Sequence, residues 1–244
     1  GQNVPSGGNV PPTTTIIPDT VAGPLLAWHD MQNINLLANV GINDADPIGT
    51  IKNAATTGAT YDLIQAAAGK RSLFRKVADG TKINGLSAIE SVGGGKHYQS
   101  NAFTLVAQPI TWMWVFRNTA TGTQVIASGG AANTNQTHSQ VTAINMFAGT
   151  TQAPALNITA NIWQTLIVRY DGAAATATLN GATVSGFGNV GALGIDQIGM
   201  LWNPAESAGA DFIGFMAEQA IWTGNPSVAA IIAYANAKYG ANPQ

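Results

Sequence analysis

The stretch WQTLIVRYDGAAATATLNGATVSG, residues 163–186, decides the fold class. Its first part, WQTLIVRY, is rich in β-branched and aromatic residues and predicts a strand. The later part, ATATL, alternates small and apolar residues, as a second strand would. The dipeptides Asp-Gly and Asn-Gly, which begin at Asp171 and Asn180, are typical of tight turns. The segment therefore predicts antiparallel strands joined by hairpin turns.

Similar apolar runs recur along the chain between Gly, Asn and Asp turns. They are TWMWVFR (111–117), QVIAS (124–128) and AINMFAG (143–149). In the first of them, Trp112, Trp114 and Phe116 share one face, so we expect an aromatic stripe in the core between two sheets. Many short strands without regular alternation of strand and helix predict an all-β sandwich or barrel.

The C-terminal end has a different pattern. NPSVAAIIAYANAKYG, residues 225–240, carries apolar residues at helical spacing. Asn225 is a candidate N-cap, Pro226 suits the first helical position, and Gly240 suits the C-terminal cap. We expect one closing helix at about 226–239 that packs on the sandwich.

The N-terminal segment GQNVPSGGNVPPTTTIIP is rich in Pro, Gly and Thr and has no periodicity. It predicts an extended arm or linker over residues 1–20, followed by one domain over residues 21–244. We expect the arm to lie against a neighbouring subunit; a disordered terminus is the alternative. The sequence starts without Met and shows no signal peptide, which indicates a trimmed, processed or tag-derived start.

The composition is polar but nearly uncharged. Charged residues make up 9% of the chain, against a usual share of about 25%, and the net charge is −2. This charge gives no electrostatic footprint for nucleic acid, and the basic residues between 70 and 82 are typical of a solvated loop. Cysteine is absent, and no apolar run approaches the length of about 18 residues that spans a bilayer. We therefore expect neither a nucleic-acid partner nor membrane insertion.

The order of these segments resembles the laminin-G-like branch of the concanavalin A-like lectin/glucanase superfamily. The segments that carry the resemblance are LLAWHDMQNINLL (25–37), INGLSAIESVGGGKHYQS (83–100), TWMWVFR, WQTLIVRYDGAAATATLNGA, and FIGFMAEQAIW with the helix ending in AKYG. The resemblance implies an all-β, concanavalin A-like jelly-roll β-sandwich with an extended N-terminal arm and one C-terminal α-helix. It also implies a virion or extracellular setting, because members of this branch occur in phage virions and on bacterial surfaces. The branch's Phe-Asp-Gly motif is replaced here by ESVGGG (90–95), so no ligand role of that Asp carries over.

Glu218 is the single acidic residue in MAEQAIWTG, residues 216–224. Retaining glucanases of the superfamily place paired carboxylates on one strand face, about 5–5.5 Å apart. No second carboxylate follows Glu218 on its strand. We therefore expect Glu218 to form structural hydrogen bonds rather than to catalyse, and an amide there to cost little stability. The sequence predicts that the protein is not an enzyme, with a glucanase-type glycoside hydrolase as an alternative.

Two loops offer ligand-binding residues. NDADP (43–47) presents Asn43, Asp44 and Asp46, whose oxygens suit calcium; a plain turn ending in proline is the alternative. The three histidines lack the spacing of a zinc site, so we expect no cofactor other than this calcium.

The second loop, WNPAESAGAD, follows a predicted strand. Trp202 together with Asn203, Glu206 and Asp211 would suit stacking on a sugar and hydrogen bonding to its hydroxyl groups. Packing of Trp202 at the rim of the sandwich is the alternative reading.

Together these features predict a non-catalytic, lectin-like module of a phage virion, in the role of a decoration or fibre/adhesion protein. Its expected partners are host-surface polysaccharide and, through the N-terminal arm, neighbouring virion or shell subunits. A purely structural capsid decoration protein without ligand is the alternative, beside the glucanase-type hydrolase.

Overall fold

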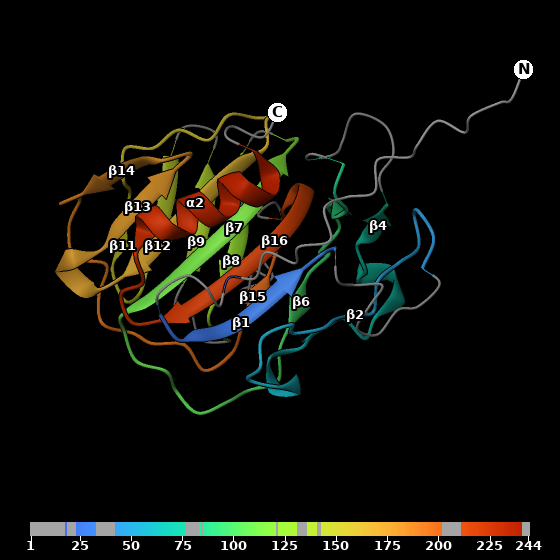
Figure 1. The fold of residues 1–244 in the computed structure, drawn as a ribbon, viewed down its shortest axis with the longest axis horizontal. Coiled ribbons are helices and arrows are strands. Elements are labelled where there is room, and N and C mark those ends of the chain that lie inside the picture. The colour runs from blue at the N-terminus through green and yellow to red at the C-terminus, as the bar shows by residue number, and fades with distance from the viewer. Residues whose placement is uncertain are drawn as a thin grey trace, which may run out of the picture.

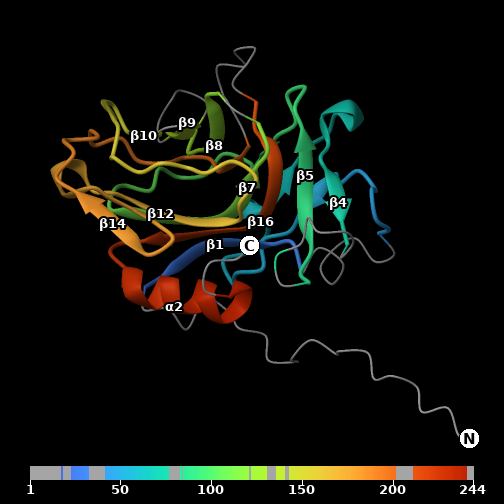
Figure 2. The same cartoon turned by 90° about the horizontal axis from the view of Figure 1, so that it is seen from above.

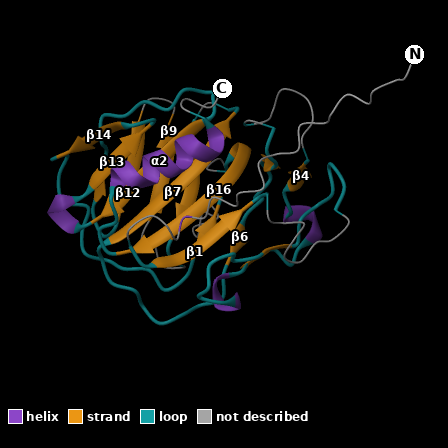
Figure 3. Cartoon of the chain, in the orientation of Figure 1, coloured by secondary structure: helices purple, strands orange, loops and turns teal. Residues whose placement is uncertain are grey.

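The computed structural model describes residues 18, 23–32, 42–76, 83, 85–120, 122–130, 136–140, 143–201 and 211–240. Except for Pro18, the predicted arm over residues 1–20 lies outside this part of the chain. Within the described residues, strands dominate and helices are few (Figure 3). In this part of the chain, no helix combines the length and apolar character that crossing a membrane requires.

The described strands form two antiparallel sheets of eight strands each (Figure 1). Sheet A runs in the order β14 (Ala182–Ser185), β13 (Thr176–Leu179), β12 (Gln164–Tyr170), β7 (Ile110–Asn118), β16 (Ile213–Thr223), β5 (Ala88–Val92) and β4 (Leu73–Arg75), with β1 (Leu25–Asp30) also paired to β16. Sheet B runs in the order β11 (Thr151–Gln152), β10 (Ala143–Phe147), β9 (Gln136–Gln140), β8 (Gln124–Ser128), β15 (Gly199–Met200), β6 (Tyr98–Gln99), β3 (Leu63–Ile64) and β2 (Thr50–Ile51). The remaining elements are α2 (Val228–Tyr239) and the 3-10 turns η2 (Ala59–Tyr61), η3 (Ala68–Lys70) and η4 (Gly172–Ala174). This architecture confirms the predicted all-β jelly-roll sandwich with one C-terminal helix.

The hairpin region forms as its turn dipeptides predict. β12, β13 and β14 pair in sequence, and the β13–β14 turn has positive φ at Asn180 (49°) and Gly181 (88°). Glycine and asparagine tolerate this left-handed backbone better than other residues. The Asn180 side chain also accepts a hydrogen bond from the backbone N–H of Thr165 at 2.9 Å, which ties the turn to the neighbouring strand.

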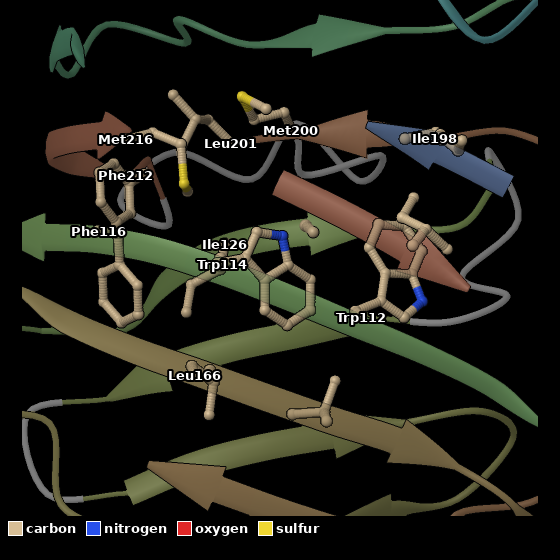
Figure 4. Close-up of a cluster of buried hydrophobic side chains, with 14 of the residues drawn as sticks. Trp112, Trp114, Phe116, Ile126, Leu166, Ile198, Met200, Leu201, Phe212 and Met216 are labelled. Carbon is tan, nitrogen blue, oxygen red and sulfur yellow. The ribbon is translucent and has the colours of Figure 1, made fainter. Parts of the chain in front are cut away.

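The core between the sheets contains the predicted aromatic stripe. Trp112, Trp114 and Phe116 are at most 1% exposed and contact residues of both sheets (Figure 4). The rings of Trp112 and Trp114 stack with centroids 5.4 Å apart. The indole N–H of Trp114 donates to the Gln219 side-chain oxygen at 2.8 Å, so this polar atom is satisfied inside the core.

A second apolar layer lies on the outer face of sheet A, beneath α2 (Figure 2). The helix buries four side chains against the sheet: Ile231, Tyr234, Ala235 and Tyr239. The strands contribute, among others, Trp28, Met113, Val115 and Trp222, and Trp163 joins them from the position just before β12. Thr111, Met113 and Val115 of TWMWVFR are therefore buried as well, which explains why β7 has almost no polar face.

The start of the closing helix corrects the sequence prediction. The helix begins at Val228 rather than at 226, and Ser227 rather than Asn225 is the N-cap, accepting a hydrogen bond from the backbone N–H of Ala230 at 3.3 Å. Pro226 belongs to the preceding loop, where its carbonyl accepts a hydrogen bond from Arg169 at 3.0 Å. The hydroxyl of Ser227, two residues after the predicted N-cap Asn225, therefore satisfies the first turn of the helix.

Candidate functional site

A β-bulge decides where the carboxylate of Glu218 lies. Along β16, Met216 pairs with Phe116 of the inter-sheet core, whereas Glu218 pairs with Val115 of the layer beneath α2. The register shift between them inserts Ala217 as one extra residue. Without the bulge, strict alternation would place Glu218 on the face that contains Met216. The bulge therefore turns Glu218 toward the helix.

Glu218 is fully buried and accepts hydrogen bonds from four side chains. Its Oε1 accepts from the Trp28 indole N–H at 2.7 Å and from the Tyr234 hydroxyl. Its Oε2 accepts from Lys238 Nζ at 2.9 Å and from the Tyr239 hydroxyl. The predicted hydrogen-bonding role therefore has a defined set of partners. The sequence predicted that an amide at this position would cost little stability. These contacts indicate a larger cost, because the amide nitrogen that Glu218→Gln introduces would face hydrogen-bond donors where Glu218 presents an acceptor.

The partner carboxylate that β16 lacks comes from β1. Asp30 is the direct cross-strand neighbour of Glu218, and its Oδ2 lies 2.7 Å from Lys238 Nζ. Lys238 therefore lies between two carboxylates, and its Nζ is also 5.3 Å from the centre of the Trp28 ring. We call Asp30, Glu218 and Lys238 the carboxylate–lysine cluster. Sequence spacing could not reveal it, because Asp30 and Glu218 meet only through β1–β16 pairing.

Burial governs the protonation of this cluster. Burial raises the pKa of Asp30 to about 6; Lys238 acts in the lowering direction and Glu218 in the raising direction. Burial alone would lower the pKa of Lys238, but Glu218 and Asp30 outweigh it and raise it. Burial, with the two carboxylates, also raises the pKa of Tyr234 and Tyr239 well above the usual value, so both remain hydroxyl donors.

The cluster is enclosed by its own protein. The side chains of Glu218, Asp30 and Lys238 are 0%, 4% and 11% exposed. Both oxygens of Glu218 are occupied by donors from the same chain. The carboxylate pair therefore faces the lysine and aromatic rings rather than a groove.

The predicted sugar-binding loop is only partly within the described residues. Trp202, Asn203 and Glu206 lie outside them. Asp211 lies inside, and its Oδ2 accepts a hydrogen bond from the backbone N–H of Gly95 at 2.9 Å. One carboxylate oxygen of Asp211 is therefore used to hold the turn between β5 and β6.

The three residues of the predicted calcium turn make hydrogen bonds and ion pairs within the chain. Asp46 Oδ2 accepts from the backbone N–H of Asn43 at 2.7 Å. Asp44 Oδ1 accepts from the backbone N–H of Lys76 at 2.9 Å, and Asp44 Oδ2 lies 3.5 Å from Arg75. Among the described residues, no group of three or more His, Cys, Asp or Glu side chains is arranged to hold a metal ion.

The outer face of sheet B carries a continuous cross-strand row that sequence reasoning missed. Backbone pairing places the following residues directly beside one another, from β2 to β11: Thr50, Ile64, Gln99, Gly199, Ser128, Gln136, Phe147 and Thr151. We call this set the sheet B row. Its neighbours in sequence, such as Ile51, Leu63 and Met146, are buried in the inter-sheet core, so the row lies on the opposite face.

The sheet B row is polar but without ionic side chains. The eight strands of sheet B contain no Asp, Glu, Lys or Arg, whereas sheet A contains several. Thr151 and Ile64 are exposed, Gln99 and Phe147 are half-buried, and Gly199 and Ser128 are buried. In Figure 2, α2 covers sheet A on the side away from β8, β9 and β10. The row therefore offers hydroxyl, amide and aromatic groups on a face that α2 does not cover.

Comparisons with known proteins support the fold. No protein-family model and no curated relative matches the sequence. A GH54 α-L-arabinofuranosidase soaked with a cyclic sulfate inhibitor is similar over 92% of this chain and 64% of its own, with a TM-score of 0.61 and 13% identity. Trypanosoma rangeli sialidase in complex with sialic acid is similar over 88% of this chain and 33% of its own, with a TM-score of 0.58 and 8% identity.

This chain thus spans about a third of the sialidase and slightly less than two thirds of the arabinofuranosidase. At such low identities the likeness concerns the fold alone. The two antiparallel sheets and the closing helix agree with the segment order of the sequence, and the two similar structures agree with the fold. The chain therefore has the concanavalin A-like jelly-roll fold.

Proposed function

We propose that this chain is a non-catalytic, lectin-like module that binds a neutral glycan across the outer face of sheet B. The observation that carries the proposal is the sheet B row, which combines amide and hydroxyl groups with Phe147 and contains no ionic side chain. Neutral sugars are recognised by such groups, because hydroxyls exchange hydrogen bonds with amides while an aromatic ring covers their C–H face. The two similar structures, an arabinofuranosidase and a sialidase bound to sialic acid, add a carbohydrate context.

The absence of catalysis is part of this proposal. Its support is the enclosure of Glu218 and Asp30, the two carboxylates closest to a glucanase pattern, beneath α2. A glycosidase needs its carboxyl groups on either side of a scissile bond, and no sugar can enter between side chains that already donate to both oxygens of Glu218.

We further propose that the module is displayed on the exterior of a virion or cell. One support is the low content of charged residues, which make up 9% of the chain. The other is the resemblance of the segment order to phage virion and bacterial surface proteins. In this setting the arm over residues 1–20 would join the module to a neighbouring shell subunit. A decoration protein without a ligand would share this location but would bind no glycan.

The test is binding of the purified chain to a panel of neutral, sialylated and sulfated polysaccharides in affinity gel electrophoresis. We expect retention by at least one neutral polysaccharide, with no release of reducing ends. Phe147→Ala should weaken that retention about fivefold, because an aromatic contact contributes about 1 kcal/mol. Val92→Ala is the matched control, since Val92 is 57% exposed on sheet A and away from the row.

Several outcomes would contradict the proposal. Retention that the two variants leave equally unchanged would place the ligand elsewhere. No retention by any neutral polysaccharide would favour the ligand-free decoration protein. Release of reducing ends that is lost in Glu218→Gln would favour the hydrolase. Circular dichroism of each variant checks that the fold is retained.

A further inference from the structure

The carboxylate–lysine cluster places an amine against a carboxyl carbon. Lys238 Nζ lies 2.7 Å from Asp30 Oδ2. Because a carbonyl bond is about 1.23 Å long, Nζ and the Asp30 carboxyl carbon are no more than about 4 Å apart. Reacting atoms in near-attack geometry are about 3–3.5 Å apart, so a small movement of the lysine chain suffices. β1 and α2 hold both groups in place, which removes most of the entropy cost of their encounter.

We propose that Lys238 and Asp30 condense into an intramolecular isopeptide bond, with Glu218 as the proton-transfer group. The bond would join the first described strand of sheet A to the last turn of the closing helix. No cofactor or co-reactant is needed, because the reaction forms one amide and one molecule of water.

The environment favours the neutral product. Burial raises the pKa of Asp30 to about 6, which increases the share of the carboxylic acid form that can lose water. With Asp30 protonated, the Lys238 ammonium and the Glu218 carboxylate remain as one buried ion pair. Condensation removes this pair of charges from the interior, where each charge carries a desolvation cost.

The condensation transfers one proton to Glu218 and releases one water molecule. Glu218 Oε2, 2.9 Å from Nζ, takes one proton from the ammonium group, and the neutral amine then attacks the Asp30 carboxyl carbon. A C–N bond forms and the bond from this carbon to Oδ2 breaks. A second ammonium proton leaves with the acid's own O–H as water, and the third stays on the amide nitrogen. Glu218 ends the step protonated.

Two further contacts suit this chemistry. Asp30 Oδ1, the oxygen that stays, accepts a hydrogen bond from the backbone N–H of Gln32 at 3.0 Å, where negative charge would develop during attack. Trp28 and Tyr234 both donate to Glu218 Oε1, which fixes the other oxygen toward the lysine.

A second lysine–aspartate pair provides an internal comparison. Lys52 Nζ lies 2.6 Å from Asp62 Oδ2, as close as the pair in the cluster. The Lys52 side chain is 34% exposed, however, and within the described residues its ion pair involves Asp62 without a second carboxylate. Proximity without burial and without a proton-transfer group should give no bond.

The test is intact-mass and tandem mass spectrometry of the purified, folded chain. We expect a mass lower than the sequence mass by one water molecule, and a branched peptide that joins Asp30 to Lys238. Asp30→Ala, Lys238→Arg and Glu218→Gln should each restore the full mass expected for the variant. Lys52→Arg is the matched control and should keep the deficit of one water. The cross-linked chain should also run faster on a denaturing gel than the three variants, because its unfolded form contains a closed loop.

Clear results would overturn the proposal. A folded wild-type chain that keeps its full sequence mass after prolonged incubation would refute the bond. A water deficit that fragment ions assign to another position, such as cyclisation at Asp171-Gly172, would refute it as well. A branched peptide that persists in Glu218→Gln would refute the role given to Glu218. Because the wild-type mass decides the main question, a variant that fails to fold does not prevent the test.

Discussion

Replacing His29 with Gln should make the stability of this domain less sensitive to acid. The imidazole is fully buried, and its Nε2–H donates to the carbonyl oxygen of Tyr61 at 2.7 Å. Its Nδ1 is also buried and has no hydrogen-bond partner among the described residues. A proton added at Nδ1 would therefore be a buried charge without an acceptor, whereas Gln can keep the bond to Tyr61 and does not titrate.

The magnitude follows from the shift in pKa. Burial lowers the pKa of His29 from 6.5 to about 4, although the bond to Tyr61 and the nearby Asp62 act in the raising direction. As the pH falls, the unfolded chain binds a proton first, so the folded state is stabilised above the unfolded pKa and loses stability toward the folded pKa. This loss amounts to about 3 kcal/mol by about pH 4.

Asp30 acts in the opposite sense over much of the same range. Its folded pKa of about 6 lies above the ordinary value of 3.8, so its contribution to stability is present at low pH and is lost as the pH rises through about 6. Because wild type and His29→Gln share Asp30, the difference between their free energies of unfolding isolates the histidine. If Asp30 is bound to Lys238 as an amide, it does not titrate, and the same difference still applies.

Urea unfolding of both proteins, near neutral pH and at about pH 4, measures this effect. We expect the free energy of unfolding of His29→Gln, relative to wild type, to rise by about 3 kcal/mol between the two conditions. A relative stability that does not change with pH would refute the reasoning, because it would mean that the buried imidazole titrates as it does in the unfolded chain.

Two further predictions concern packing. Ile231→Asp should destabilise the domain by several kcal/mol, because Ile231 is 0% exposed on the face of α2 that packs on sheet A. The control Ala229→Asp changes an exposed residue of the same helix and should have little effect on the thermal midpoint. Equal midpoints for the two variants would mean that α2 does not pack on sheet A. Gly214→Ala should also destabilise strongly, since its Cβ would lie 2.1 Å from the Arg117 carbonyl oxygen at a φ of 149°. Gly94→Ala is the control: Gly94 also has a positive φ, but an added Cβ would meet no atom within 4 Å, so this change should cost about 1 kcal/mol of stability. An equally small cost for Gly214→Ala would count against the close approach of β16 and β7.

Sequence patterns predicted the parts of this fold that depend on neighbours along the chain. The hairpin strands of residues 163–186 follow from alternation and turn dipeptides, and the closing helix follows from its spacing and its C-terminal glycine. The aromatic stripe of Trp112, Trp114 and Phe116 follows from the two-residue period of a strand. In each case the energetic preference that decides the structure acts over a few residues.

The carboxylate–lysine cluster depends on features that no local pattern contains. A single extra residue, Ala217, turns Glu218 to the helix side, and a bulge of this kind has no strong sequence signature. Asp30 and Lys238 come from opposite ends of the domain and meet through strand pairing and helix packing. The apolar segment around Glu218 showed that its carboxylate would need partners, but not which ones.

The sheet B row was out of reach for a similar reason. Five of its strands, β2, β3, β6, β11 and β15, contain two residues each, too few for a periodic pattern. Their side chains gain a common face only once all eight strands are in register. The predicted site loop, with Trp202 at its start, lies largely outside the described residues, so that hypothesis remains a prediction.

The position of the cluster also has a mechanical consequence. Asp30 ends the first described strand of sheet A, and Lys238 lies one residue before the end of α2. A pulling force applied to the chain on both sides of the domain would enter along β1 and leave through the last turn of α2. With an amide between the two side chains, tension would pass directly from Asp30 to Lys238, and the sandwich that lies between them in sequence would carry no load. The glycan-binding face would then keep its shape under tension.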